Sequence, residues 1–256
     1  MTNEAIIQTQ SQFVAMRNDL IQKSRYSLSL TEQRMLLLMI SKITPYDEAG
    51  KEYPFTFTQF REVCNISKGG NTNKELKAAL AELKTKPLII PLNEDEEVIT
   101  SWFNDARLNR RTGEIMVSFS RYLSPYLFEL QRQMYYTQFK LSEAIAMKSA
   151  YGIRLLEYLK SIRTLRNKEP ITLNQLRERL GCEGKYPAWK DLRLNVLEPA
   201  ITDVNTYSDM LVEYELEKQG KKVVAVRFVI RESLIQYAKA QRNRKEALEP
   251  KEQNKE

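Results

Sequence analysis

The 256-residue chain contains no histidine. This absence removes Ser-His-Asp and Cys-His triads, the usual zinc sites and His-based acid–base catalysis from consideration. The eight glycines form no GxxxxGKS/T pattern, which argues against a P-loop nucleotide site. We therefore predict a protein that is not an enzyme and that carries no cofactor and no metal ion.

Cysteines and long apolar runs are also scarce. In a reducing compartment Cys64 and Cys182 are expected to be small buried apolar residues rather than a disulfide. No apolar run approaches the roughly 18 residues of a membrane span. The first twelve residues lack the basic start and apolar stretch of a signal peptide. We expect a cytoplasmic protein without membrane contact.

Basic residues are concentrated in the second half of the chain. The net charge is +7, yet residues 1–130 hold 16 basic and 16 acidic side chains, whereas residues 131–256 hold 24 and 17. A basic balance is compatible with an anionic partner such as nucleic acid, although many basic proteins bind none. If an anion is bound, the second half should contribute more to it.

One segment of the chain occurs twice, 116 residues apart. PFTFTQFREV at residues 54–63 matches PITLNQLRER at residues 170–179 in five of ten positions. At the same offset KELK at residues 74–77 meets KDLR at residues 190–193. A repeat that continues without a gap for about thirty residues indicates two copies of one structural unit.

Each copy predicts three helices. Apolar residues at helical spacing predict a first helix at residues 30–43 and at residues 141–162. A second, short helix follows an extended segment, with Thr58 or Asn174 as the expected N-cap. Glycines mark the next turn, and a third helix is predicted at about residues 73–86 and 188–205. Pro199 lies inside the last of these and implies a kink near Val196, or a helix that ends and restarts.

A β-hairpin is predicted after each third helix. In the second unit, alternation over residues 212–217 and 224–230 flanks a turn at residues 218–221. The first unit is less regular, with strands expected at residues 88–90, 98–103 and 115–119 and a tight turn at residues 109–113. The predicted fold class is α+β, namely two tandem winged helix-turn-helix domains related by an internal repeat.

In a winged helix that binds DNA, the third helix enters the major groove and the wing holds phosphates. The candidate DNA-binding residues of the second unit are Lys185, Tyr186, Lys190, Arg193 and Asn195 around the helix and Lys218, Lys221 and Lys222 on the wing. Those of the first unit are Lys68, Asn71, Asn73, Lys74 and Lys77 around the helix and Arg110 and Arg111 at the hairpin tip. Arg193 is the residue best suited to bidentate recognition of guanine.

Other interpretations of these residues remain open. Lysines on an outward helix face are often only solvated, and winged helices also serve as protein interaction modules. Asp191, Glu198 and the acidic run at residues 94–97 would repel phosphate. Trp189 fits the apolar side of its helix and is expected to pack in the core rather than stack on a base.

Three stretches resemble the iteron-plasmid replication initiator (Rep) family of the RepB/RepE-like kind. They are GEIMVSFSRYLSPYLFEL at residues 113–130, YGIRLLEYL at residues 151–159, and VLEPAITDVN with the two strands that follow it, at residues 196–230. The resemblance covers about residues 15–235. No single motif in it is diagnostic, but their order and spacing together are specific.

The resemblance implies a plasmid replication initiator that binds directly repeated double-stranded DNA sites, the iterons. Monomers would open the origin and help load host replication proteins such as the helicase or DnaA, and dimers formed through the first domain would repress the initiator's own gene. It implies an N-terminal winged-helix domain at residues 1–130 for dimerisation and secondary DNA contact. The C-terminal winged-helix domain at residues 131–240 would make the main DNA contact. The composition of residues 241–256 predicts a basic, charged tail that is disordered.

Two other functional classes were compared with this one. A rolling-circle nickase uses a tyrosine nucleophile with a histidine-bound metal, and the absence of histidine argues against it despite thirteen tyrosines. A winged-helix transcriptional regulator without a replication role would have the same modules. It remains the alternative function.

Overall fold

The computed structural model describes residues 2–67, 69, 72–130, 135–165, 169–232 and 234–248. The first unit and the segment before it contain α1 (Asn3–Ser11), β1 (Phe13–Arg17), α2 (Asn18–Lys23), α3 (Leu30–Ile40), β2 (Glu52–Thr56), α4 (Phe57–Val63), α5 (Thr72–Thr85), β3 (Leu88–Pro91), β4 (Glu97–Thr100), β5 (Phe103–Leu108), β6 (Glu114–Phe119) and α6 (Ser124–Leu127). The second contains β7 (Tyr136–Lys140), α7 (Leu141–Ala146), α8 (Ala150–Ile162), β8 (Ile171–Thr172), α9 (Leu173–Leu180), α10 (Trp189–Leu192), a π-helical segment (Arg193–Leu197), α11 (Glu198–Tyr207), β9 (Met210–Gln219), β10 (Lys222–Glu232) and α12 (Leu234–Leu248).

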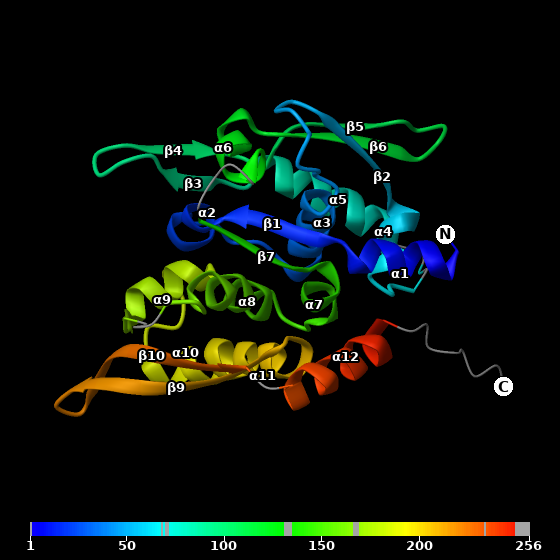
Figure 1. Ribbon diagram of the computed structural model, residues 1–256. Coiled ribbons are helices and arrows are strands. Elements are labelled where there is room, and N and C mark those ends of the chain that lie inside the picture. The colour runs from blue at the N-terminus through cyan, green and yellow to red at the C-terminus, as the bar shows by residue number, and fades with distance from the viewer. Residues whose placement is uncertain are drawn as a thin grey trace.

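The two units share one topology. In the first, the helices are α3, α4 and α5 and the sheet has the order β2-β6-β5. In the second, the helices are α8, α9 and α10–α11 and the sheet has the order β8-β10-β9. In both, the short strand before the second helix pairs with the second strand of the hairpin. Figure 1 shows the first hairpin, β5–β6, and the second, β9–β10, projecting toward opposite sides of the molecule. The α+β class and the tandem winged helices predicted from the repeat are confirmed.

A two-stranded ribbon that no local pattern predicted joins the beginnings of the two units. β1 and β7 pair antiparallel, with Phe13 opposite Lys140 and Arg17 opposite Tyr136. The ribbon crosses the middle of the molecule in Figure 1. It ties the segment before the first winged helix to the segment before the second.

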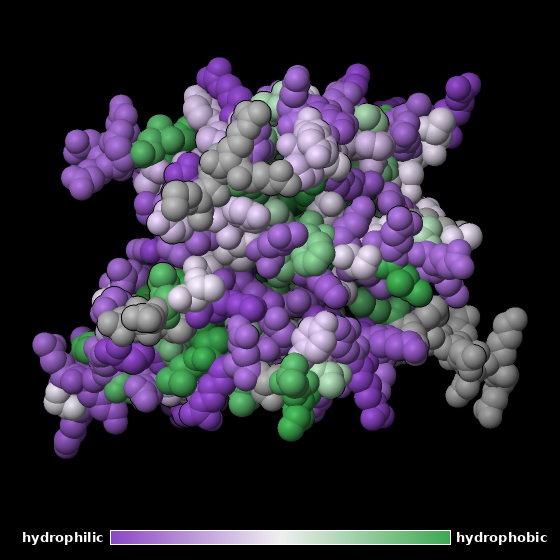
Figure 2. Space-filling view, in the orientation of Figure 1, coloured by the Kyte–Doolittle hydropathy of each residue, from purple (hydrophilic) through white to green (hydrophobic). Residues whose placement is uncertain are grey.

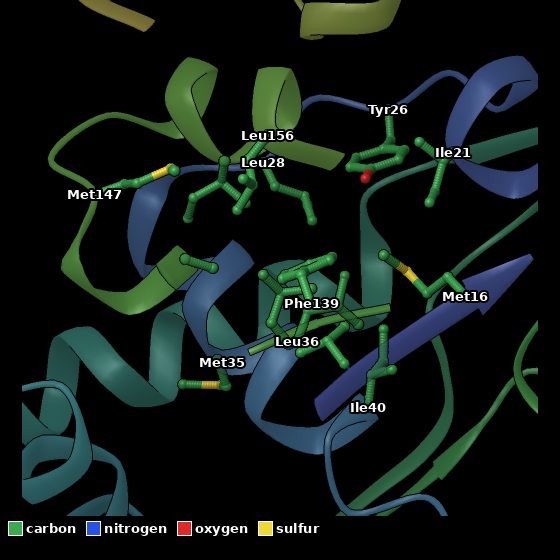
Figure 3. Close-up of a cluster of buried hydrophobic side chains, with 14 of the residues drawn as sticks. Met16, Ile21, Tyr26, Leu28, Met35, Leu36, Ile40, Phe139, Met147 and Leu156 are labelled. Carbon is green, nitrogen blue, oxygen red and sulfur yellow. The ribbon is translucent and has the colours of Figure 1, made fainter. Parts of the chain in front are cut away.

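The core is one continuous cluster that extends through both units. Leu76, Leu80 and Leu83 of α5 are buried in it, as are Leu192 and Val196 of the second unit, on the faces that helical spacing predicted. Figure 3 shows side chains of α3 meeting those of the ribbon and of α8 in the middle of this cluster. The two winged helices therefore do not have separate cores.

The N-caps of the second helices differ from those predicted. Thr56 and Thr172 cap α4 and α9 by accepting hydrogen bonds from the backbone N–H of Gln59 and Gln175, three residues on. Gln175 also accepts a hydrogen bond from the Thr172 N–H, which completes a capping box. The predicted caps, Thr58 and Asn174, lie inside the helices.

Three further boundaries needed correction. The helix predicted at residues 141–162 is broken at residues 147–149, where Ser149 caps α8. The strand predicted at residues 98–103 ends at Thr100, and the chain turns there into β5, which was not predicted. The tail predicted to be disordered from residue 241 is helical through Leu248, because α12 buries Ala240 and Arg244 against the body. Residues 249–256 lie outside the described residues.

Candidate nucleic-acid interface

Two arginines at matching positions of the repeat support the third helix of each unit, which we call its recognition helix. It is α5 in the first unit and α10 to α11 in the second. Arg61 of α4 donates hydrogen bonds to Asn73 at the start of α5 (2.7 Å) and to Thr58 (3.2 Å). Arg177 of α9 donates from Nη2 to the carbonyl oxygens of Tyr186 and Pro187, both at 3.0 Å, just before α10. A charged donor on a backbone carbonyl forms one of the stronger hydrogen bonds in proteins. The repeated segment thus supports the helix that follows it in each unit.

Gly181 shapes the turn that leads to the second recognition helix. It closes α9 with φ of +69°, in the left-handed region where glycine is favoured. A Cβ at this position would lie 2.5 Å from the carbonyl oxygen of Tyr26, in the first unit. The turn therefore requires glycine both for its conformation and for the close contact between units.

The second recognition helix presents part of its predicted contact set to solvent. Lys185, Lys190 and Asn195 are exposed, whereas Tyr186 is half-buried against the core. Tyr186 shares a side-chain hydrogen bond with Tyr151 of α8, and burial together with this bond raises the pKa of Tyr151 to about 12. Tyr186 therefore has a packing role, and its role in DNA contact stays a prediction.

Arg193 is engaged within the protein. Its Nη1 lies 3.2 Å from Glu198 Oε1, and its side chain is 40% exposed. Trp189 of the same helix packs edge-on against Tyr214 of β9, with ring centroids 6.5 Å apart, as expected for a packing residue. Recognition of a base by Arg193 remains a prediction, and it would require the guanidinium to extend past Glu198.

The wing of the second unit is basic at its tip. Lys218 lies next to Gln219, the last residue of β9. Gly220, with φ of +61°, and Lys221 form the turn, and Lys222 begins β10. All three lysines are exposed, and hydrophilic residues dominate this projecting tip in Figure 2. Among the described residues, no carboxylate pairs with these lysines or with Lys185 and Lys190. Their charges are available to an outside anion.

The first unit offers a smaller set. Lys74 and Lys77 are exposed on α5, while Asn73 accepts the hydrogen bond from Arg61 and so has a structural partner. Arg110 and Arg111 are exposed at the tip of β5–β6, in the predicted tight turn that Asn109 closes by accepting from the N–H of Arg111 and of Thr112. Lys68 and Asn71 lie outside the described residues.

The acidic run at residues 94–97 lies away from the basic tip of the first unit. It forms the turn between β3 and β4, and this hairpin projects to the opposite side from β5–β6 in Figure 1. Glu97 is paired with Arg25, at 2.5 Å between Oε2 and Nη2. The run is thus well separated from the phosphate contacts proposed for Arg110 and Arg111.

The two cysteines carry no reactive thiolate. Both are buried and free, and burial raises the pKa of Cys64 to about 12 and that of Cys182 to about 11. Both therefore stay protonated near neutral pH and serve as apolar side chains, as expected. In the described part of the chain, no helix is both long enough and apolar enough to span a membrane.

Comparison with known proteins adds the family. The sequence model described as "Initiator Replication protein, WH1" matches residues 13–160, and the one described as "Initiator Rep protein, WH2" matches residues 172–230. The chain belongs to the Rep initiator family. The first matched segment ends beyond the boundary expected at residue 130, and α8 packs on α11 and α9 of the second unit. The exact domain division stays a prediction.

Two individual relatives show how far the likeness to the Rep family extends. A "Replication initiation protein" of Escherichia coli is 28% identical over 223 residues, which cover 82% of this chain and 67% of the relative. A crystal structure of the Pi initiator protein in complex with iteron DNA matches with a TM-score of 0.68 at 18% identity. It covers 88% of this chain and 99% of the other. At this low identity, the likeness to the Pi initiator protein shows a shared fold.

The sequence did not predict the internal contacts that support the candidate interface. The roles of Arg61 and Arg177 could have been found, since the repeat keeps arginine at both positions while the neighbouring apolar residues vary. The Arg193–Glu198 pair could not, because it depends on a helical turn of unusual length. The β1–β7 ribbon joins residues too distant in sequence for any local pattern to pair them.

Proposed function

We propose that this protein initiates plasmid replication by binding directly repeated double-stranded DNA sites (iterons) at an origin. In this proposal it opens the origin and recruits host replication proteins such as the helicase or DnaA. As a dimer formed through its first domain, it also represses its own gene. Membership of the Rep family and the fold shared with an initiator that was crystallised with iteron DNA support the proposal.

The observation that carries it is the pairing of each recognition helix with a basic hairpin tip. Exposed lysines of the second recognition helix and of its wing have no carboxylate partner among the described residues. Unpaired cations around a helix that fits the major groove suit a duplex, whose phosphates bind cations and whose base edges are read in the groove.

We assign the main contact to the second unit. Lys190 and Asn195 of its helix are assigned to the base edges, and Arg193 would join them once its guanidinium extends past Glu198. The lysines of its wing are assigned to phosphates. The excess of basic side chains in residues 131–256 supports this order. The first unit would add Lys74 and Lys77 and the arginines of the β5–β6 tip.

Footprinting on duplexes selected by the protein from a random library tests the proposal. We expect protection of a defined sequence that occurs as several direct repeats beside the gene, about one or two helical turns apart. A cloned gene with its flanking repeats should maintain a plasmid that has no other origin. Binding without sequence preference, or failure of that plasmid to replicate, would contradict the proposal.

A transcriptional regulator built from the same modules gives a different result. It would protect a lone inverted repeat near its promoter, and the plasmid test would fail while repression of a reporter gene succeeded. Cleavage or joining of DNA by purified protein with a divalent metal would instead require an enzymatic role.

A further inference from the structure

The second recognition helix contains a widened turn that the first one lacks. α10, the π-helical segment Arg193–Leu197 and α11 follow one another without a break, and the Glu198 N–H donates to the Arg193 carbonyl, five residues earlier. α5 runs as a regular α-helix over Thr72–Thr85. Single π turns inside α-helices are often found at functional sites.

Pro199 explains why the turn widens here. Proline has no N–H, and in an α-helix its ring would clash with the carbonyl of the residue four positions earlier, which is Asn195. A turn of five residues relieves this conflict. The Pro199 side chain is exposed, so its replacement removes no core contact. The residue acts on the backbone of the helix rather than on its packing.

The widened turn brings together two side chains that an α-helix keeps apart. Residues five apart lie about 140° apart around an α-helix of 3.6 residues per turn, whereas in a π turn, which joins residues five apart by a hydrogen bond, they lie on the same side of the helix, as residues four apart do in an α-helix. Here Arg193 Nη1 and Glu198 Oε1 are 3.2 Å apart. The Tyr214 hydroxyl of β9 lies 3.5 Å from the same carboxylate oxygen. Arg193 is thereby held at the junction between recognition helix and wing.

The same turn determines which residues form the outer face of the helix. Lys190, Leu194 and Asn195 are exposed there, and Leu194 is 44% exposed although it is apolar. The Asn195 side chain donates to the Asp191 carbonyl at 2.9 Å, which fixes its orientation on this face. An exposed leucine between a lysine and an asparagine fits a groove that offers apolar methyl groups as well as polar base edges.

We propose that Pro199 is a positioning residue for sequence recognition: it imposes the five-residue turn that holds Arg193 on Glu198 beside the wing and leaves Lys190, Leu194 and Asn195 as the face toward the DNA. The proposal rests on the DNA-binding function proposed above. Without the turn, the part of the helix before it would rotate relative to the part after it. The base-reading side chains would then no longer match the site, while the phosphate contacts of the wing would remain.

The test compares Pro199→Ala with wild type and with Glu198→Gln. The probes are a duplex selected by the wild-type protein and an unrelated duplex of equal length. We expect Pro199→Ala to be folded and at least as stable as wild type, since alanine favours a helix. Its affinity for the selected duplex should fall about tenfold or more, as for the loss of a good base contact, while its affinity for the unrelated duplex is unchanged.

Base preference provides a readout that a purely structural role would not change. Pro199→Ala should select a site altered at the positions read by the first part of the helix, and Glu198→Gln, which leaves the turn in place, should alter fewer of them. Wild-type affinity and base preference in Pro199→Ala would overturn the proposal.

A crystal structure of Pro199→Ala tests whether Pro199 imposes the widened turn, independently of the proposed DNA-binding function. If wild type itself prefers no sequence, the proposed function is wrong; if wild type prefers a sequence and Pro199→Ala keeps the same preference, only the role of Pro199 is wrong. A regular α-helical turn in the variant, with Arg193 released from Glu198, supports the positioning role of Pro199. A retained five-residue turn contradicts it.

Discussion

At the scale of single residues, the clearest division is between side chains that build the interface and side chains free to contact DNA. Arg61 and Arg177 donate hydrogen bonds to other groups of the protein, whereas Lys185 and Lys190 are exposed to solvent. Side chains of the first kind are identical at matching positions of the repeat, because both units need the same internal support. The second kind is only partly shared between the units, since Lys190 matches Lys74 but Lys185 matches Gly69 at the same offset.

Arg177 provides a prediction at this scale. Arg177→Met keeps much of the apolar stem but leaves the carbonyls of Tyr186 and Pro187 without their charged donor. We expect a loss of about 1–3 kcal/mol in the free energy of unfolding, measured by urea denaturation. Lys185→Met removes the same charge from an exposed position nearby and should change stability by less than about 0.5 kcal/mol. Equal stability of the two variants would show that Arg177 does not support the turn.

At the scale of elements, the loop between α3 and β2 carries a pH-dependent contribution to stability. Burial acts to raise the pKa of Asp47, but hydrogen bonds from Lys51, Thr44 and Tyr53 outweigh it and lower the pKa to about 2. Because the pKa of Asp47 is lower in the folded protein, its carboxylate stabilises the fold at pH values above the ordinary pKa near 4. This stabilisation is lost as the pH falls from about 4 to about 2. The carboxylate should therefore matter most near neutral pH.

Asp47→Asn tests that contribution. We expect the variant to be less stable than wild type by about 1 kcal/mol at pH 7, and the difference to shrink as the pH approaches 2. Denaturant unfolding of both proteins across this range provides the measurement. A difference that stays constant with pH would mean that the asparagine acts through packing rather than through the lost charge.

The wing is the second element with a measurable role. Replacement of Lys221 and Lys222 by alanine should weaken the selected and the unrelated duplex alike, and lower the slope of log affinity against log salt by about one per lysine. Lys23→Ala is the control, since Lys23 pairs with Asp19 at 2.8 Å on α2. Loss of affinity for the selected duplex alone would assign the wing lysines to bases rather than to phosphates.

The order of elements was predictable, and their ends and long-range partners were less so. Helical periodicity located the recognition helices, and the hairpin of the second unit was evident from strict alternation. The N-caps of the second helices were predicted two residues too late, because Thr56 and Thr172 resemble the last residues of a strand. Only their hydrogen bonds with Gln59 and Gln175 identify them as caps. The break before α8 depends on Asp203, whose carboxylate accepts from the N–H of Lys148 and of Ser149. Such a partner, more than fifty residues away, leaves no local signal.

The sequence also located the repeated scaffold of the candidate site better than its contact surface. Lys190 and Lys74 lie on the outer faces that the helical wheel indicated. The surroundings of Arg193, Asn73 and Tyr186 could not be predicted, since each has a partner that only the folded chain supplies. Pro199 was the one clear sign that the second helix departs from a regular α-helix.

At the scale of the whole molecule, the two winged helices form one body. Arg154 of α8 is buried against Glu157 at 3.1 Å, lies over the Tyr26 ring at 3.9 Å from its centroid, and donates to the Tyr26 hydroxyl. Gly181 presses against the Tyr26 carbonyl. Together with the continuous core and the β1–β7 ribbon, these contacts fix the distance and angle between the two recognition helices.

This rigidity predicts how binding depends on the spacing of the DNA site. If the two domains moved independently, inserting about half a helical turn of DNA at the centre of the footprint would abolish one of the two contacts. Inserting a full turn of about ten base pairs would restore it, because the groove then faces the same way again. A rigid pair cannot reach the shifted groove in either case. We therefore expect both insertions to reduce affinity to that of the second unit alone, as measured by titration and footprinting. The matched control duplex carries the same ten base pairs outside the footprint and should bind normally. Recovery with the central ten-base-pair insertion would show that the two units move independently on DNA, despite their shared core.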